Sequence, residues 1–248
     1  MSRIFVDIGA HYGETLSVAL DPKWGFTQVV SVEPSARCLP LLKSFRDPRL
    51  SVHQVALSNR DDTAILHGAG LLGGSLYADK AQLTDQVDTE SVTLVRASNW
   101  FKQNIPAGAE VFLKMNCEGG EADILDDLLD SGEIARVRSM YVDFDIRKVP
   151  SQAHRQAELE RRLSEAGVRW TQVDRRNFGA NEGVTQWLSK ECPVVSASAS
   201  ALIRHRLHSY APPYVRATML ARNLMPKQLY WWLGRRFGRN ARKNNAAI

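Results

Sequence analysis

The chain has 248 residues, of which 44% are hydrophobic and 24% charged, and its formal net charge is +5 at pH 7. This length and composition suit one large globular domain with an appendage, and they exclude a disordered or fibrous protein. No run of about 20 apolar residues occurs, so we expect no transmembrane helix.

The cysteines and the first residues indicate a reducing environment. Cys38, Cys117 and Cys192 are odd in number and scattered, without a C-x-x-C spacing, so neither a disulfide framework nor a zinc cluster is indicated. An apolar run begins at Arg3 without the pattern of a secretory signal peptide. We therefore expect a cytoplasmic location.

Apolar runs alternate with helical patterns through most of the chain. The runs predict strands over residues 3–8, 28–33, 50–56, 110–115, 138–144 and 168–173, and the helical patterns predict helices over 35–45, 119–130 and 151–166. The last helix is expected to have Ser151 as its cap and a core face of Ala153, Leu159, Leu163 and Ala166. This alternation predicts an α/β fold: a doubly wound, mostly parallel sheet with helices on both faces.

Residues 60–96 are less regular, and a glycine cluster occupies 68–74. Short β-like pieces flank this cluster. Because glycine clusters occur in mobile and ligand-contacting loops, we interpret the segment as a flexible crossover near the mouth of a pocket.

The first strand leads into a glycine turn. The stretch FVDIGAHYG, residues 5–13, contains Asp7, Gly9 and Gly13, and the second strand delivers Glu33 twenty residues later. Glycine lets the backbone approach a ligand closely, and an acid at the end of the second strand can accept hydrogen bonds from ribose hydroxyls. The glycine turn alone also fits an ordinary strand-to-helix connection, but Glu33 favours a cofactor pocket.

The glycine spacing disfavours a dinucleotide. A G-x-G-x-x-G fingerprint places a pyrophosphate at a helix N-terminus, whereas here Ala10 and His11 stand where that contact is needed. S-adenosylmethionine carries no phosphate and fits the pattern better. Asp7 would also suit the positively charged end of that cofactor.

A third polar cluster follows the strand at 110–115. The stretch VFLKMNCEGGE, residues 111–121, holds Lys114, Asn116, Glu118 and Glu121 at a strand-to-helix junction. Since ligands bind at the carboxyl ends of parallel strands, these side chains are expected to face the same crevice as the first loop. A role as a solvated first-turn acid is the favoured interpretation for Glu121, and a functional role is favoured for Lys114 and Glu118.

Together these motifs resemble the FkbM family of S-adenosylmethionine-dependent methyltransferases, whose pattern here is similar to L-K-x-D-x-E-G-x-E. The matching residues are Leu113, Lys114, Glu118, Gly119 and Glu121. The resemblance also covers the D-I-G-A-x-x-G loop, Glu33 with Pro34, and the turn from Ala56 to Asn59, and it runs from about residue 3 to about residue 175. It implies a Rossmann-like class I methyltransferase fold and O-methylation of a glycan or small-molecule hydroxyl, although the residues alone do not exclude a nitrogen acceptor.

The site residues follow from the motifs and the resemblance together. To the cofactor we assign Asp7, Gly9, Gly13 and Glu33, with Ala56 and Asn116 in its vicinity. To substrate or proton handling we assign Lys114, Glu118 and Asp145. No acid or histidine spacing favours a metal site, so none is predicted.

Asn116 departs from the family pattern, which has an aspartate there. An amide cannot take a proton at neutral pH, so another base would be needed. The candidates are Glu118, Glu121, Asp143 and Asp145. For the cluster at the end of the strand in 141–148, both a functional role and plain solvated charges stay open. The same departure also allows a non-catalytic module that binds a nucleotide-type ligand, whereas a nicotinamide-dependent oxidoreductase is disfavoured by the glycine spacing.

The C-terminal part is strongly basic. After Glu191 the sequence has ten lysines and arginines and no acid, so residues 1–191 carry a net charge of −5. The SASASA run at 196–201 resembles a linker, which predicts a methyltransferase domain over 1–195 and a helical tail over 196–248.

Aromatic residues accompany the arginines of this tail in the run LYWWLGRRFGR, residues 229–239. This composition indicates peripheral membrane contact through residues 202–243, and packing of the aromatics on the catalytic domain is the alternative. Nucleic-acid binding is disfavoured because no fold signature accompanies the charge. Only two residues precede the first strand, so we expect an open site, which favours a large acceptor such as a saccharide chain or a lipid-linked glycan.

Overall fold

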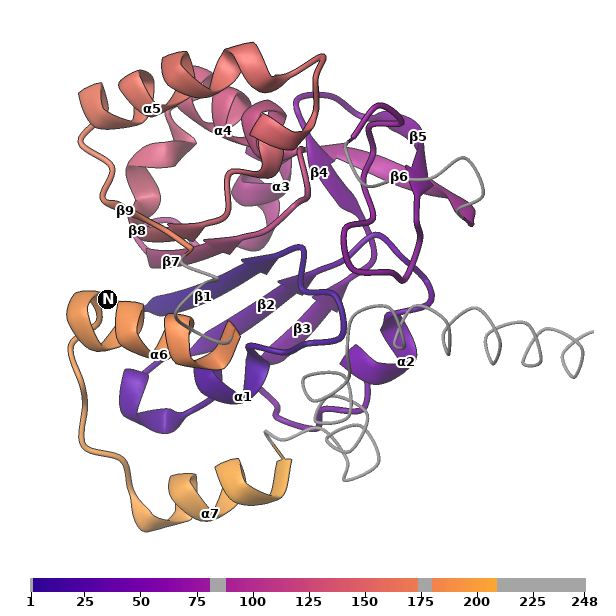
Figure 1. Cartoon of the computed structure of the whole chain (residues 1–248). Helices are drawn as coiled ribbons and strands as arrows, with labels where there is room; N and C mark the ends of the chain where they lie inside the picture. Colours follow the sequence, from indigo (N-terminus) through magenta and orange to yellow (C-terminus); the bar gives the residue numbers. More distant parts are fainter. Residues whose placement is uncertain (1, 81–87, 174–179, 209–248) are drawn as a thin grey trace, which may run out of the picture. The chain divides into compact units, whose positions relative to one another are not determined.

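The computed structural model describes residues 2–80, 88–173 and 180–208, which belong to one unit, Met1–Tyr210 (Figure 1). From residue 209 onward the predicted tail, including its aromatic run, lies outside the described residues. The predicted domain boundary between residues 195 and 196 stays a prediction.

A six-stranded parallel sheet forms the centre of this unit. Its strands lie in the order β3-β2-β1-β7-β8-β9, and every neighbouring pair is parallel. They are β1 (Arg3–Ile8), β2 (Gln28–Val32), β3 (Leu50–His53), β7 (Glu110–Met115), β8 (Val137–Val142) and β9 (Trp170–Gln172). The predicted doubly wound, Rossmann-like α/β fold is therefore confirmed.

The chain reverses its direction of travel across the sheet at β1. From β1 it moves through β2 to β3 at one edge, and it returns to β7 on the other side of β1 before reaching β8 and β9. The register pairs Asp7 with Lys114 and Ile8 with Met115. A crevice at the carboxyl ends of β1 and β7 is where an open parallel sheet binds its ligand.

Helices cover both faces of the sheet (Figure 1). One face carries α3 (Ala97–Asn104), α4 (Glu121–Asp130) and α5 (Gln156–Glu165), and the other carries α1 (Leu16–Ala19) and α6 (Ala180–Glu191). Because helices cover both faces, side chains on both sides of the strands are buried, and the strand sequences are nearly continuous apolar runs.

Aromatic rings join α6 to its face of the sheet. The Trp187 ring stacks on Tyr141 with centroids 5.6 Å apart, and it contacts Phe5 and Phe112 at 6.2 and 6.1 Å. Its Nε1 donates a hydrogen bond of 2.9 Å to Ser139 Oγ, so the one polar atom of the indole is satisfied in the core.

A second, three-stranded sheet stands beside the first one and corrects the prediction of an irregular crossover. It consists of β4 (Ala56–Ser58), β5 (Asp62–His67) and β6 (Thr89–Arg96), in the order β4-β6-β5. β5 and β6 pair antiparallel from Asp62 opposite Leu94 to His67 opposite Thr89. The expected short β-like pieces are present, but their pairing into a sheet was not predicted, because only Leu66 in β5 and Val92 and Leu94 in β6 are buried apolar residues.

Two predicted helices are shorter in the structure. α2 covers only Leu39–Leu42, because Pro40 at its start restricts where the helix can begin. The helix predicted from Ser151 begins at Gln156 after a 3₁₀ turn, and the Ser151 amide instead donates to Asp79 Oδ2 at 2.8 Å.

The predicted core face of that helix is confirmed only in part. Leu159 and Leu163 are buried, whereas Ala153 is half-buried and Ala166 is exposed. Helices α3 and α6 were not predicted from the sequence.

The close approach of the first loop to β7 gives a test of the fold. Gly9 has φ +75°, and a Cβ atom there would lie 2.0 Å from the Asn116 carbonyl oxygen, whereas Gly108 has φ +74° and open space around it. We expect Gly108→Ala to lower the free energy of unfolding by about 1 kcal/mol through backbone strain. Gly9→Ala should cost at least about 2 kcal/mol more, because backbone must move.

Urea denaturation of both variants measures this difference. Equal losses in the two proteins would contradict the contact between the Gly9 turn and the end of β7.

Candidate functional site

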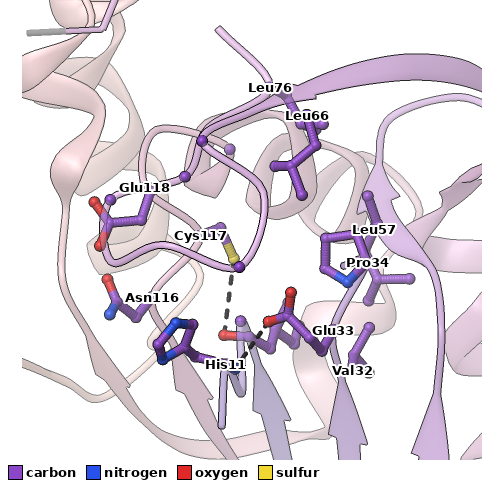
Figure 2. A pocket seen from close by; sticks show the side chains of 18 of the residues that line it. His11, Val32, Glu33, Pro34, Leu57, Leu66, Leu76, Asn116, Cys117 and Glu118 are labelled. Carbon is purple, nitrogen blue, oxygen red and sulfur yellow. Dashed lines mark hydrogen bonds between the residues drawn. The ribbon is translucent and has the colours of Figure 1, made fainter. Parts of the chain in front are cut away.

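An open cavity lies at the carboxyl ends of β1, β2 and β7 (Figure 2). Its walls come from four parts of the chain: the β1 loop, the end of β2, the second sheet with the glycine segment 68–74, and the turn after β7. The lining residues include Gly9, His11, Glu33, Pro34, Ala56, Leu57, Leu66, Leu76, Asn116, Cys117 and Glu118. The cavity therefore occupies the crevice that the sheet topology indicates.

The cavity has an apolar side and a polar side. Figure 2 shows Val32, Pro34 and Leu57 on one side, with Leu66 and Leu76 above them. His11, Asn116 and Glu118 lie on the other side, and the Glu33 carboxylate stands between the two groups. A ligand with a flat apolar end, a hydroxylated middle and a charged end matches this order.

Glu33 joins two loops while facing the cavity. Its Oε2 accepts a hydrogen bond from the His11 amide at 2.8 Å, and its Oε1 accepts one from the Ser35 amide at 3.0 Å. Burial raises the pKa of this carboxyl group above its usual value. The hydrogen bond from the Ser35 amide, and the charge and amide of His11, oppose that shift. Each oxygen keeps a second lone pair that can accept from a ligand.

The backbone amides of the first loop are already used. Gly9 and Ala10 donate to the Val32 carbonyl at 2.9 and 3.2 Å, His11 donates to Glu33, and Gly13 donates to the Ala10 carbonyl at 2.8 Å. A phosphate-binding loop needs such amides directed at its ligand. These four amides therefore form no phosphate cradle.

Asp7 and Lys114 lie beneath the loop, outside the residues that line the cavity. Asp7 is fully buried, its Oδ1 lies 2.8 Å from Lys114 Nζ, and its Oδ2 accepts from Thr15 Oγ1 at 2.6 Å. Lys114 Nζ also donates to the Gly9 carbonyl at 3.0 Å. The pair thus holds the turn in place from below.

Gly13 also supports the loop from outside the cavity. Its φ is +79°, and a Cβ atom would come within 2.9 to 3.1 Å of the Leu16, Leu42 and Phe45 side chains. The tight packing against these side chains accounts for glycine at this position without any ligand.

Glu121 fastens the turn after β7. Its carboxyl group is fully buried and accepts from the amides of Cys117 at 3.0 Å and Gly119 at 3.1 Å. Burial raises its pKa to about 8. The expectation of a solvated first-turn acid is therefore wrong, because the turn folds back over this side chain.

Glu118 has a backbone conformation that is rare outside glycine, with φ +55°. The Ser75 hydroxyl donates to the Glu118 carbonyl at 2.7 Å, and Lys80 forms an ion pair with its carboxylate. Lys80 Nζ also donates to the Gly73 carbonyl at 2.9 Å, and only 3% of this lysine is exposed. The segment from Gly73 to Lys80 thus fixes Glu118 at the polar side of the cavity.

A second carboxyl group contacts Glu118 from outside the cavity. Asp145 is fully buried, is hydrogen-bonded to Glu118, and lies 2.6 Å from Lys148 Nζ. Burial, and then the Asp145 carboxyl group, raise the pKa of Glu118, while Lys80 opposes the shift. A carboxylate with a raised pKa in a cavity is suited to take a proton near neutral pH.

The neighbouring Asp143 is also buried, so the two acids after β8 are not the solvated strand-end charges that one interpretation assumed. Asp143 Oδ1 accepts from Gln172 Nε2 at 3.2 Å and lies 3.5 Å from Arg147 Nη2. Asp145 begins a 3₁₀ turn, Asp145–Lys148, rather than continuing the strand.

Five of the nine predicted site residues line the cavity, and four support it. The lining residues are Gly9, Glu33, Ala56, Asn116 and Glu118. The supporting residues are Asp7, Gly13, Lys114 and Asp145. Sequence reasoning missed Lys80 and His11: Lys80 belongs to no motif, but His11 stands inside the glycine loop and has a positive φ of +50°.

The fold and the cavity define a Rossmann-like α/β protein with a cofactor-type site at the sheet's switch point. A family model described as the methyltransferase FkbM domain matches residues 7–169, more than half of the chain. The chain therefore belongs to the FkbM methyltransferase family and is a methyltransferase. No curated protein and no solved structure matches it.

The burial of Glu121 predicts a pH dependence of stability. Its pKa is about 8 in the folded protein against an ordinary value of 4.5, so between these values the folded protein keeps a proton that the unfolded chain has released. The free energy of unfolding should therefore fall as the pH rises through this window, by up to about 1.4 kcal/mol per pH unit. Glu121→Gln, which does not titrate, should flatten the fall.

Urea denaturation between about pH 5 and about pH 8 measures this slope. Glu165→Gln, on an exposed part of α5, is the control and should keep the wild-type slope. A Glu121→Gln slope equal to that of the wild type would show that Glu121 titrates normally.

Proposed function

We propose that this methyltransferase transfers a methyl group from S-adenosylmethionine to a hydroxyl oxygen of a glycan or a small molecule. The observation that carries the proposal is the position of Glu33 between an apolar and a polar side of one cavity. Adenine suits the apolar side, the ribose hydroxyls suit a carboxylate acceptor, and the amino-acid end suits the polar side. The occupied amides of residues 9–11 and 13 favour this phosphate-free cofactor over a dinucleotide.

When bound, S-adenosylmethionine supplies a methyl carbon that is already activated by its sulfonium. The protein must hold the acceptor hydroxyl in line with that carbon and take its proton. We assign the proton to a Glu118 carboxylate oxygen, because the Asn116 amide cannot accept it. Asn116, on the same side of the cavity, is suited to orient the hydroxyl through its amide.

In this scheme Lys80 and Asp145 set the protonation state of Glu118. Asp145 shares a hydrogen bond with Glu118 and raises its affinity for the proton, whereas the Lys80 ammonium stabilises the carboxylate that must be present at the start. Lys80 is a positioning residue, since it acts through Glu118 and through the Gly73 carbonyl. Lys114, paired with Asp7 beneath the loop, has a structural role in this scheme.

Isothermal titration with S-adenosylmethionine and S-adenosylhomocysteine tests the cofactor. We expect micromolar binding of both, weakened about tenfold to a hundredfold in Glu33→Gln, because the amide loses charge-assisted hydrogen bonds to the ribose. Glu158→Gln, an exposed change on α5, should bind as the wild type does. The absence of heat with either ligand, or unchanged binding in Glu33→Gln, would refute the assignment.

Product formation separates catalysis from binding alone. A methyltransferase converts the cofactor to S-adenosylhomocysteine when an acceptor is present, whereas a non-catalytic module would bind both ligands and form no product. Glycans and lipid-linked sugars are the first acceptors to test.

The role of Lys80 can be measured without knowing the acceptor. In protein labelled with ¹³C at the glutamate carboxyl carbons, Glu118→Gln identifies the Glu118 signal. We expect Lys80→Met to raise the pKa of Glu118 further, because the opposing positive charge is lost, and Lys80→Arg to keep it near the wild-type value. Lys102→Met, on the exposed side of α3, is the control. A Glu118 titration unchanged by Lys80→Met would contradict the ion pair.

A further inference from the structure

Helix α7 (Ala199–His208) follows α6 and packs on the unit that holds the cavity (Figure 1). It contacts the 3₁₀ turn η1 (Pro22–Trp24), and its last carbonyl, that of His208, accepts from the Arg46 amide at 3.1 Å. The chain leading into it is fixed by a 2.8 Å hydrogen bond from the Val195 amide to the Lys23 carbonyl. The helix is therefore held against the fold before the sequence enters the basic region beyond residue 208.

The apolar side chains of α7 point away from the fold. Leu202, Ile203 and Leu207 are 45%, 59% and 70% exposed, whereas His205 is only 7% exposed. At 3.6 residues per turn the three apolar residues fall within an arc of about 140°, and His205 lies outside that arc. A surface helix normally buries its apolar stripe, so the outward face of α7 has the character of a contact surface.

Exposed apolar residues are concentrated in this part of the chain. Among the described residues, seven large hydrophobic side chains are exposed, and five of them lie between 194 and 207. They are Val194, Val195, Leu202, Ile203 and Leu207. The other two, Ile65 and Leu72, belong to the region of the second sheet.

Exposed cations accompany these apolar side chains. Arg204 and Arg206 are exposed on α7, and Arg46 is exposed beside the end of the helix. None of the three forms an ion pair within residues 2–80, 88–173 and 180–208. Beyond the helix the sequence adds eight more lysines and arginines and no acid, together with Trp231, Trp232 and Phe237.

We propose that α7 docks the enzyme on an anionic lipid surface, with Leu202, Ile203 and Leu207 entering the boundary between headgroups and acyl chains. Arg46, Arg204 and Arg206 would then meet lipid phosphates. On α7 exposed apolar residues and exposed cations share one face, because Arg206 lies between Leu202 and Ile203 on the helical wheel. A long cationic side chain can reach lipid phosphates while its apolar neighbours enter the membrane interface. The contact is peripheral: in the part of the chain that the structure describes, no helix is long and apolar enough to cross a bilayer.

Vesicle flotation of the full chain tests this surface. We expect the protein to float with vesicles of phosphatidylcholine mixed with phosphatidylglycerol, and to float less with phosphatidylcholine alone. Replacing Leu202, Ile203 and Leu207 together by serine should lower the fraction bound at least about tenfold, because the apolar contribution is lost. Arg204→Gln with Arg206→Gln should weaken binding and reduce its dependence on salt.

Two controls test whether the effect is specific to α7 and whether the variants remain folded. Ile65→Ser removes an apolar residue of similar exposure from β5 and should float as the wild type does. Circular dichroism should show an unchanged thermal transition for the α7 variants, since the replaced side chains are already exposed.

Three results would overturn the proposal. The first is a wild-type protein that does not float with anionic vesicles. The second is a triple serine variant that floats as well as the wild type. That result would show that the lipid contact is made by residues other than the apolar face of α7. A third contrary result is binding to RNA or DNA in a gel-shift assay that the same variants abolish, without vesicle binding. All three are independent of the titration with S-adenosylmethionine.

Discussion

The buried ion pair between Asp7 and Lys114 is the interaction on which the site depends. The two residues face each other in the register of β1 and β7, at the point where the sheet topology reverses. A buried carboxylate without a partner would cost several kcal/mol, so neither residue can be lost alone without destabilising this edge. Through its bond to the Gly9 carbonyl, Lys114 also fixes the loop whose His11 amide holds Glu33. The position of the cavity's central acid thus follows from a charge pair outside the residues that line the cavity.

The parallel sheet could be predicted from the sequence because its strands are buried on both sides and read as unbroken apolar runs. The elements that were missed have few buried residues. β5 buries one large apolar side chain, and α6 buries Val184, Trp187 and Leu188. The partners of Trp187 are aromatic rings of strands far away in the sequence. A local sequence pattern carries no information about such distant partners. Weakly amphipathic helices and strands that depend on them therefore cannot be predicted from the pattern alone.

The same reason limits what the sequence tells about the site. Charges at strand ends were correctly expected to gather at one edge, but the direction of each side chain depends on pairing that only the fold supplies. Lys114 turns under the loop toward Asp7, and Asp145 reaches the cavity only through Glu118. Lys80 and Glu118 are 38 positions apart in the sequence. The residues just before Lys80, 76–79, form no helix or strand, so no local pattern predicts this contact. The sequence motifs therefore identified the residues that line the cavity more reliably than the residues that position them.

The charge balance at the polar side explains how asparagine fits at position 116. Two carboxyl groups, the buried Asp145 and the partly buried Glu118, already face the ammonium groups of Lys148 and Lys80. An aspartate at 116 would place a third negative charge on the same side of the cavity, which would raise the pKa of its neighbours further and favour their neutral forms. A neutral amide keeps the balance and leaves Glu118 as the carboxylate on the polar side of the cavity. Because Ser75, Lys80 and Glu121 together hold the turn at 118 and 119, Glu118 keeps its place in the lining of the cavity.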